Sequence, residues 1–232
     1  MTDSELRGVR ACVFDAYGTL FDTGSAAQRC ADAVGEAVPQ LATLWRDKQL
    51  QYTWLRAIEG RHADFWQVTG EALDHAMATL GIGDAGLRER LMQAYLALDV
   101  YPEAPAVLHQ LRAAGMVTAI LSNGTPAMLA AIIDHAGLTL LFDAALSVET
   151  VGIYKPHSAV YQLACDRFGL AAKAILFVSS NGWDAWGASA FGFRVAWCNR
   201  RGLARERLPG APDYEIGSLA ELPGLLTASQ GS

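Results

Sequence analysis

From Val107 to the end of its apolar runs near Trp197, the chain alternates between helical and strand-like segments. The expected strands cover Met116–Leu121, a short run before Ser147, Ala174–Val178 and Phe193–Trp197, and the expected helices end near Ala114, begin after Pro126, span Ser158–Phe168 and begin after Trp183. Alternation of this kind is typical of a parallel sheet whose strands are joined by crossover helices. The sequence therefore predicts an α/β fold built on a doubly wound, Rossmann-like parallel sheet.

Residues 25–98 interrupt the alternation with four segments of helical spacing. Ala, Leu, Gln, Arg and Glu dominate there, and the expected helices lie near Ser25–Glu36, Leu41–Glu59, Phe65–Leu80 and Gly86–Leu98. An apolar run before the interruption, Ala11–Phe14, would rejoin the sheet as its first strand. We therefore expect a core domain formed by residues 1–22 and 101–232, with an inserted helical-bundle cap at residues 23–100.

The composition limits the partners that the chain can bind. Its 232 residues are 52% hydrophobic and 18% charged, which is enough for a substantial buried core. The net charge of −6 would repel nucleic acid and anionic membranes, so small molecules are the expected partners. The sequence shows no CxxC pair, no charged and apolar leader, and no apolar run of roughly 20 residues. We expect a soluble cytoplasmic protein with free thiols and neither nucleic-acid nor membrane partners.

Polar side chains follow several expected strands at the point where each strand ends. They are Asp15 after the first strand, Ser122, Asn123 and Gly124 after Leu121, Lys155 in the loop beyond Ser147, and Ser179, Ser180, Asn181 and Asp184 after Val178. Each residue type alone has an ordinary role, such as capping a helix or a turn. Because the carboxyl ends of parallel strands meet at one edge of an open sheet, where ligands bind, we expect these side chains to converge. Two carboxylates, a lysine and a hydroxyl and amide pair together predict an active site.

Five stretches carry a resemblance to a known family. They are FDAYGTLFD, ILSNG, YKP, FVSSNGWD and, in the expected cap, LWRDKQLQYTWLR. In this order they resemble the haloacid dehalogenase superfamily, and specifically the L-2-haloacid dehalogenases, over essentially the whole chain. The resemblance implies a fold of the haloacid dehalogenase type and hydrolysis of L-2-haloacids to D-2-hydroxy acids with inversion at C2. It also implies a homodimer that needs no cofactor and no metal, with a small 2-halocarboxylate and halide as its ligands.

Two positions differ from the phosphatases of that superfamily. Those enzymes usually carry an acid two residues after the nucleophile, where this chain has Tyr17, and an Asp in their fourth motif, where it has Ser180. Because Mg²⁺ prefers carboxylate ligands, a magnesium-dependent phosphatase or phosphonatase is the less favoured alternative. A non-catalytic protein that binds a carboxylate or a partner is a third alternative, and the full set of polar strand-end residues argues against it.

The resemblance assigns the chemical steps to residues of this chain. Asp15 would attack C2 in line and form an aspartyl ester, which water then hydrolyses. Lys155 would keep Asp15 ionised and oriented by pairing with it and with Asp184. Asp184, helped by Ser179 and Asn181, would position or activate the hydrolytic water.

The remaining assignments concern the substrate and the support of the site. Ser122, with backbone amides at the following helix start, would bind the substrate carboxylate because helix N-termini favour anions. Arg46 and Asn123 would hold the departing halide, although spacing alone leaves other arginines open as candidates, namely Arg29, Arg56 and Arg61. Thr19 and Tyr161 would support the site through their hydroxyl groups. The expected apolar wall consists of Tyr17, Leu50, Phe65 and Trp183.

Overall fold

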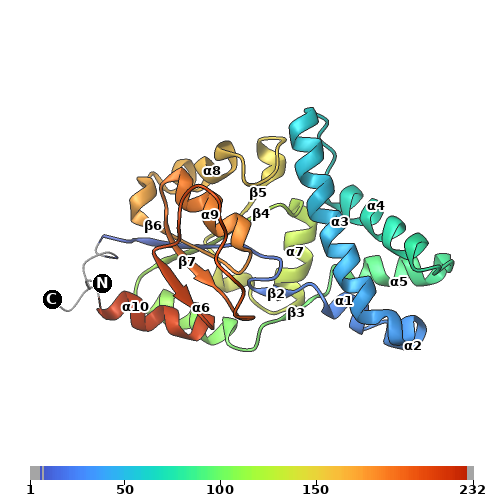
Figure 1. Ribbon diagram of the computed structural model, residues 1–232. Coiled ribbons are helices and arrows are strands. Elements are labelled where there is room, and N and C mark those ends of the chain that lie inside the picture. The colour runs from blue at the N-terminus through green and yellow to red at the C-terminus, as the bar shows by residue number, and fades with distance from the viewer. Residues whose placement is uncertain (1–5, 7, 229–232) are drawn as a thin grey trace.

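The computed structural model describes residue 6 and residues 8–228, and its core is built on a parallel sheet (Figure 1). The strands of this sheet are β1 (Ala11–Phe14), β4 (Val117–Ser122), β5 (Ala144–Ser147), β6 (Ile175–Ser179), β7 (Arg194–Cys198) and β8 (Tyr214–Ile216). Within the described residues they lie in the order β5-β4-β1-β6-β7-β8, and every neighbouring pair is parallel. The α/β class and the parallel sheet predicted from the sequence are confirmed.

Helices cover both faces of this sheet. On one face α8 (Ser158–Phe168) packs beside α9 (Gly182–Phe191), and on the other α6 (Ala104–Ala113) packs beside α10 (Leu222–Ala228) (Figure 1). Helix α7 (Pro126–His135) packs on β5. Short 3-10 turns at Thr139–Leu141, Val148–Thr150, Ala172–Ala174 and Leu219–Glu221 complete the connections.

The strand order places a reversal of the chain between β1 and β6. The chain runs from β1 outward through β4 to β5, and then returns to β6 on the opposite side of β1. This is the order of a classical doubly wound sheet, in which ligands bind beyond the carboxyl ends of the strands at the reversal. The residues that follow β1 and β6 are therefore the first place to look for a site.

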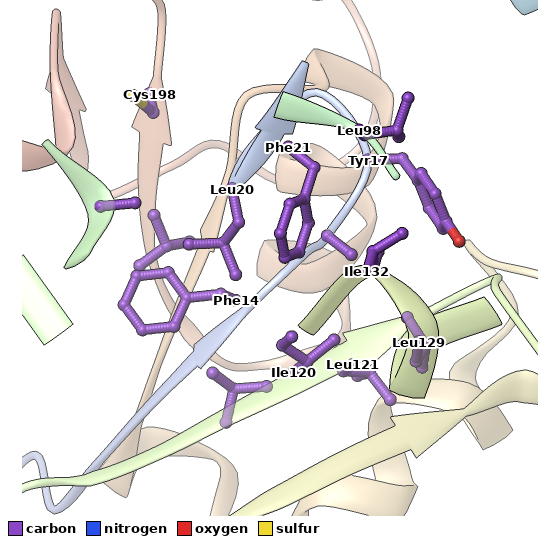
Figure 2. Packing of buried hydrophobic residues seen from close by; sticks show 14 of the residues in the cluster. Phe14, Tyr17, Leu20, Phe21, Leu98, Ile120, Leu121, Leu129, Ile132 and Cys198 are labelled. Atoms are coloured by element: carbon purple, nitrogen blue, oxygen red, sulfur yellow. The ribbon is translucent and has the colours of Figure 1, made fainter. Parts of the chain in front are cut away.

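Strand β1 is buried along its whole length because it has a parallel neighbour on each side. Its four residues pair with Val117–Ile120 of β4 and with Ile175–Val178 of β6, and none of their side chains is exposed. A continuous apolar run is what a parallel strand covered on both faces requires. Figure 2 shows Phe14 in one cluster with Leu20 and Ile120. Strand β1 is therefore tightly packed up to the residue immediately before Asp15.

The inserted helices lie between two short strands that form a second sheet. Strand β2 (Phe21–Asp22) pairs in antiparallel fashion with β3 (Asp99–Val100). In the described chain five α-helices lie between these strands and group at one end of the core (Figure 1). They are α1 (Ser25–Gln28), α2 (Ala31–Val34), α3 (Val38–Glu59), α4 (Phe65–Thr79) and α5 (Ala85–Tyr95), with a 3-10 turn at Gly35–Ala37. Across the described ranges, none of the helices is both long and apolar enough to cross a bilayer.

The prediction of one continuous helix over Ser25–Glu36 is wrong. The chain forms two four-residue helices there, because Cys30 has φ −107° and ψ 20°, which lies outside the helical region. Gly35 ends the second helix with φ +64°, a left-handed conformation that glycine adopts without a steric penalty. These two breaks separate α1, α2 and α3 from one another.

Candidate active site

Asp15 follows β1 directly, and its carboxylate accepts hydrogen bonds from three side chains. Its Oδ2 accepts from Thr19 Oγ1 at 3.1 Å and from Asn181 Nδ2 at 2.7 Å. Its Oδ1 accepts from Lys155 Nζ at 3.1 Å. A carboxylate oxygen offers two lone pairs, so Oδ2 is saturated while Oδ1 keeps one lone pair open. The carboxylate is therefore held firmly and still has one oxygen that can react.

A tight turn after Asp15 brings Thr19 back to the carboxylate. Gly18 has φ +88°, a conformation that favours glycine, and its N–H donates to the carbonyl of Phe21 at 2.7 Å. The Thr19 hydroxyl accepts from the N–H of Ser180 at 2.8 Å, which leaves its own proton for Asp15. The turn sequence thus fixes the direction in which this hydroxyl donates.

Lys155 lies between two buried carboxylates. Its Nζ donates to Asp15 Oδ1 at 3.1 Å and to Asp184 Oδ2 at 2.9 Å, and it stands 4.8 Å from the centre of the Phe177 ring. All three charged side chains are buried. The ammonium group thus bridges the two acids. Among the described residues, His, Cys, Asp and Glu side chains form no group of three placed to hold a metal ion.

Asp184 lies in the first turn of α9, and Tyr161 of α8 holds its other oxygen. The Tyr161 hydroxyl donates to Asp184 Oδ1 at 2.8 Å. Burial, with the adjacent Asp184 charge, raises the pKa of Tyr161 well above its usual value, so the hydroxyl stays protonated. Burial raises the pKa of Asp184 to about 6; the charge of Lys155 opposes this rise and that of Asp15 adds to it. At neutral pH Asp184 is therefore an ionised carboxylate that can accept a proton.

Asn181 stands at the N-terminus of α9 but directs its side chain to the nucleophile candidate. Asparagine at this position usually accepts from amides of the first turn. Here Nδ2 donates to Asp15 Oδ2 and to the carbonyl of Tyr17 at 3.0 Å. Ser179 Oγ accepts from the backbone N–H of Asn181 at 3.1 Å. Ser179 therefore supports Asn181, which in turn donates to Asp15.

The last residue of β4 and the loop that follows it supply a hydroxyl group and an amide. Ser122 Oγ accepts from the N–H of Gly124 at 3.1 Å. Asn123 Oδ1 accepts from the backbone N–H of Lys155 at 3.2 Å, so Nδ2 is the end of this amide that is left to donate. A Cβ at Gly124 would stand 2.9 Å from the ring and hydroxyl of Tyr17. Only glycine lets this loop approach Tyr17 so closely.

Arg46 reaches from α3 to the core. Its NH2 group donates to the carbonyl of Tyr17 at 3.2 Å and lies 3.5 Å from Asn181 Oδ1. Its NH1 group donates to Gln49 Oε1 at 2.8 Å. A guanidinium carries five N–H donors, so some of them remain for an anion. Asn181 contacts both Arg46 and Asp15 and so links the two side chains.

Apolar and aromatic side chains surround this polar group. The ring centre of Tyr17 lies 5.4 Å from that of Phe65 and 5.5 Å from that of Tyr95. A cleft of about 440 Å³ opens between α3 and the core loops, and its lining includes Arg46, Leu50, Asn181 and Trp183. Of the four expected wall residues, two pack against each other and two line this cleft.

The structure joins most of the residues singled out from the sequence into one group. Hydrogen bonds connect Asp15, Thr19, Arg46, Lys155, Tyr161, Asn181 and Asp184. Ser122 and Ser179 are the last residues of β4 and β6, and Asn123 follows β4 directly. Sequence reasoning missed Gln49 and Tyr95, two buried residues of the inserted helices that carry polar groups. The position of Gln49 one helical turn after Arg46 was a usable signal, because such residues lie side by side.

Comparison with known proteins defines the class. The family model of haloacid dehalogenase-like hydrolases matches residues 9–192. The chain therefore belongs to the haloacid dehalogenase-like hydrolases, as its sequence motifs indicate.

Its relatives narrow this class to one kind of enzyme. The chain is 46% identical over 219 residues to (S)-2-haloacid dehalogenase 1 of Pseudomonas sp. strain CBS-3, covering 94% of this chain and 96% of the relative. A crystal structure of a dehalogenase superposes with a TM-score of 0.93 at 46% identity, covering 95% of this chain and 98% of that chain. The structure of L-2-haloacid dehalogenase from Xanthobacter autotrophicus with chloropropionic acid covalently bound superposes with a TM-score of 0.88 at 40% identity. The match covers 94% of this chain and 98% of that chain.

Proposed function

We propose that this chain hydrolyses L-2-haloacids to D-2-hydroxy acids with inversion at C2, through an ester on Asp15. The observation that carries the proposal is the Asp15 carboxylate, in which one oxygen is saturated and the other, beside Lys155, keeps an open lone pair. The naming of the relatives as haloacid dehalogenases, and the covalent adduct in one of them, supports it.

In the first step the open oxygen of Asp15, Oδ1, attacks C2 of the substrate. A carbon–oxygen bond forms as the carbon–halogen bond breaks, and the halide leaves with the bonding electrons. A halide needs no proton, which fits a tyrosine at position 17 in place of an acid. Arg46 and the Nδ2 group of Asn123 donate to the departing anion, whose charge grows in the transition state.

In the second step water hydrolyses the ester. Asp184 takes a proton from the water, which attacks the carboxyl carbon of Asp15. The ester carbonyl oxygen is then Oδ2, which Thr19 and Asn181 already hold at 3.1 and 2.7 Å. These two donors stabilise the negative charge of the tetrahedral intermediate. The bond to Oδ1 breaks, and this oxygen takes the proton back from Asp184 and leaves as the hydroxyl group of the product. The regenerated acid of Asp15 then loses the second proton of the water to solvent.

The charged side chains of the site carry no net formal charge, so they do not repel an anionic substrate. Two carboxylates, Asp15 and Asp184, stand with two cations, Lys155 and Arg46, so the four formal charges cancel at neutral pH. The substrate carboxylate binds at Ser122 and the amides at the start of α7. Tyr17, Leu50, Phe65 and Trp183 form the apolar wall that limits water during the first step.

Release of halide from the two enantiomers of 2-chloropropionate tests this proposal. Only the L enantiomer should release chloride, and chiral chromatography should identify D-lactate as the product. Asp15→Asn serves as the inactive control. Efficient use of both enantiomers, or activity confined to phosphomonoesters and dependent on Mg²⁺, would contradict the proposal.

We further propose that residues 23–100 form a cap subdomain on a core of residues 1–22 and 101–232, and that the chain is a homodimer. The cap leaves the core at β2 and returns at β3, and these strands pair with each other. Helix α3 exposes Leu55 and Ile58. Light scattering of the purified chain tests the dimer. The cytoplasmic location expected from the sequence stays a prediction.

A further inference from the structure

We infer that Gln49 is a positioning residue for Arg46 in the halide-releasing step. Its neutral side-chain carbonyl holds the arginine fork in place without offsetting the positive charge that the halide requires. The inference rests on the function proposed above, in which Arg46 receives the halide.

The cap, and not Arg46, determines which way the Gln49 amide faces. Gln49 is fully buried on α3, and its Nε2 donates to Thr69 Oγ1 of α4 at 2.7 Å. The Thr69 hydroxyl gives its only proton to the carbonyl of Phe65 at 2.6 Å, so towards Gln49 it can only accept. The amide nitrogen therefore faces Thr69, and the carbonyl oxygen faces NH1 of Arg46 at 2.8 Å.

Tyr95, at the end of α5, closes the group. Its hydroxyl lies 3.0 Å from Gln49 Nε2 and 3.2 Å from Oε1. Burial raises the pKa of Tyr95, so it adds no charge beside the arginine. The Tyr95 ring stacks on that of Tyr17, and the carbonyl of Tyr17 accepts from NH2 of Arg46. Helices α3, α4 and α5 thus meet at Gln49.

Two carbonyl oxygens therefore fix the arginine fork, one from each side of the site, while Asn181 Oδ1 lies farther from NH2, at 3.5 Å. Gln49 holds NH1 from the cap and Tyr17 holds NH2 from the core. Neither acceptor is charged. A carboxylate in place of the Gln49 amide would pair strongly with the guanidinium and compete with the halide for its charge. A neutral acceptor gives orientation while leaving the full charge available.

Two substitutions separate orientation from charge. Gln49→Met keeps the length of the side chain and removes the acceptor, whereas Gln49→Glu keeps an acceptor and adds a negative charge. Gln51→Met is the matched control, because Gln51 is exposed on the same helix and bonds only to Lys48 in the described contacts. The measured quantity is kcat/KM for L-2-bromo- and L-2-chloropropionate, which reports the steps up to halide release.

Both Gln49 variants should lose kcat/KM for the chloro acid by about 10-fold or more, the scale of a lost hydrogen bond to a charged group. The loss should be smaller for the bromo acid, because bromide is the better leaving group and needs less help. Gln49→Glu should also weaken inhibition by added chloride. In a quenched single turnover, hydrolysis of the ester on Asp15 should keep its wild-type rate, and Gln51→Met should behave as wild type.

A wild-type ratio of bromo to chloro reactivity in both Gln49 variants would overturn the inference while leaving the proposed function intact. An equal slowing of ester formation and ester hydrolysis would also overturn it, because that pattern marks general damage to the fold. If Gln49→Met does not fold, Gln49→Glu, which keeps the size of the side chain, decides the question. Wild-type protein that releases halide from neither acid would overturn the proposed function and this inference together.

Discussion

Replacing Lys155 with Met is the most severe test of how the charges at the strand ends are balanced. One ammonium group compensates Asp15 and Asp184 at 3.1 and 2.9 Å, and all three side chains are buried. Methionine has a similar length and no charge, so the variant keeps two facing carboxylates without a cation. Removing one partner of a buried ion pair costs about 3–5 kcal/mol, against a total stability of about 5–15 kcal/mol for a typical domain.

This loss of stability should grow with pH. The pKa of Asp184 is already raised to about 6 by burial, and the charge of Lys155 opposes that rise. Without Lys155 the folded-state pKa moves higher, while the unfolded value stays about 3.9. A raised carboxyl pKa destabilises the folded state only above the unfolded pKa, and the penalty increases until the folded pKa is passed. The gap between variant and wild type should therefore widen above pH 6, by about 1.4 kcal/mol for each further unit of pKa elevation.

Urea denaturation at pH 5 and pH 8 measures this difference. Lys155→Met should lose more stability at pH 8 than at pH 5, and the double variant with Asp184→Asn should recover part of the loss at pH 8. Lys173→Met, at an exposed lysine, is the matched control. An equal loss at both pH values, with no recovery in the double variant, would refute charge compensation as the contribution of Lys155.

Three further predictions concern turnover. Chelation with EDTA should leave halide release unchanged, and a loss restored by Mg²⁺ would overturn the interpretation of Tyr17 and Ser180. Arg46→Lys should keep the melting temperature but lower kcat sharply, because a point charge cannot replace the planar fork; near-normal kinetics would return Arg46 to a surface role. The rate of ester hydrolysis should rise with pH through about 6 and then level off, since Asp184 accepts a proton only when ionised. A single-turnover pH profile that stays flat between pH 5 and 8 would exclude Asp184 as the base.

Helices whose own residues carry a sequence pattern could be predicted. Short strands that form only by pairing with a distant strand could not. Helix α8 was predicted with its observed bounds, Ser158–Phe168, and it ends at Gly169 in the left-handed conformation that glycine favours. Strands β2 and β3 were missed because each has two residues and exists only through pairing with the other, on the far side of the inserted helices. Strand β8 was missed because it has three residues at the edge of the sheet.

The candidate site divides in the same way. Asp15, Lys155 and Asp184 could be expected to converge, because each follows a strand whose end lies at one edge of a parallel sheet. The contact between Gln49 and Tyr95 could not, because it depends on how three of the inserted helices pack.

The choice of Arg46 came from the family resemblance, since spacing did not separate it from other arginines of the inserted segment. In the structure Arg29 pairs with Asp99 and Arg56 pairs with Glu71. Arg46, by contrast, donates to the core. The hydrogen bond from Arg46 of α3 to the core thus supplies the distinction that the sequence lacks.

The central claim is that Asp15, and not water, attacks C2, and one labelling experiment tests it most directly. A single turnover is run with enzyme in excess over L-2-chloropropionate in water enriched in oxygen-18. Water then attacks the carboxyl carbon of the ester, so heavy oxygen should enter Asp15, and the new hydroxyl group of the product should carry an ordinary oxygen from the protein. Peptide mass spectrometry across Ala11–Arg29 locates the label. Heavy oxygen in the product with Asp15 unlabelled would make Asp15 a general base and contradict the covalent mechanism.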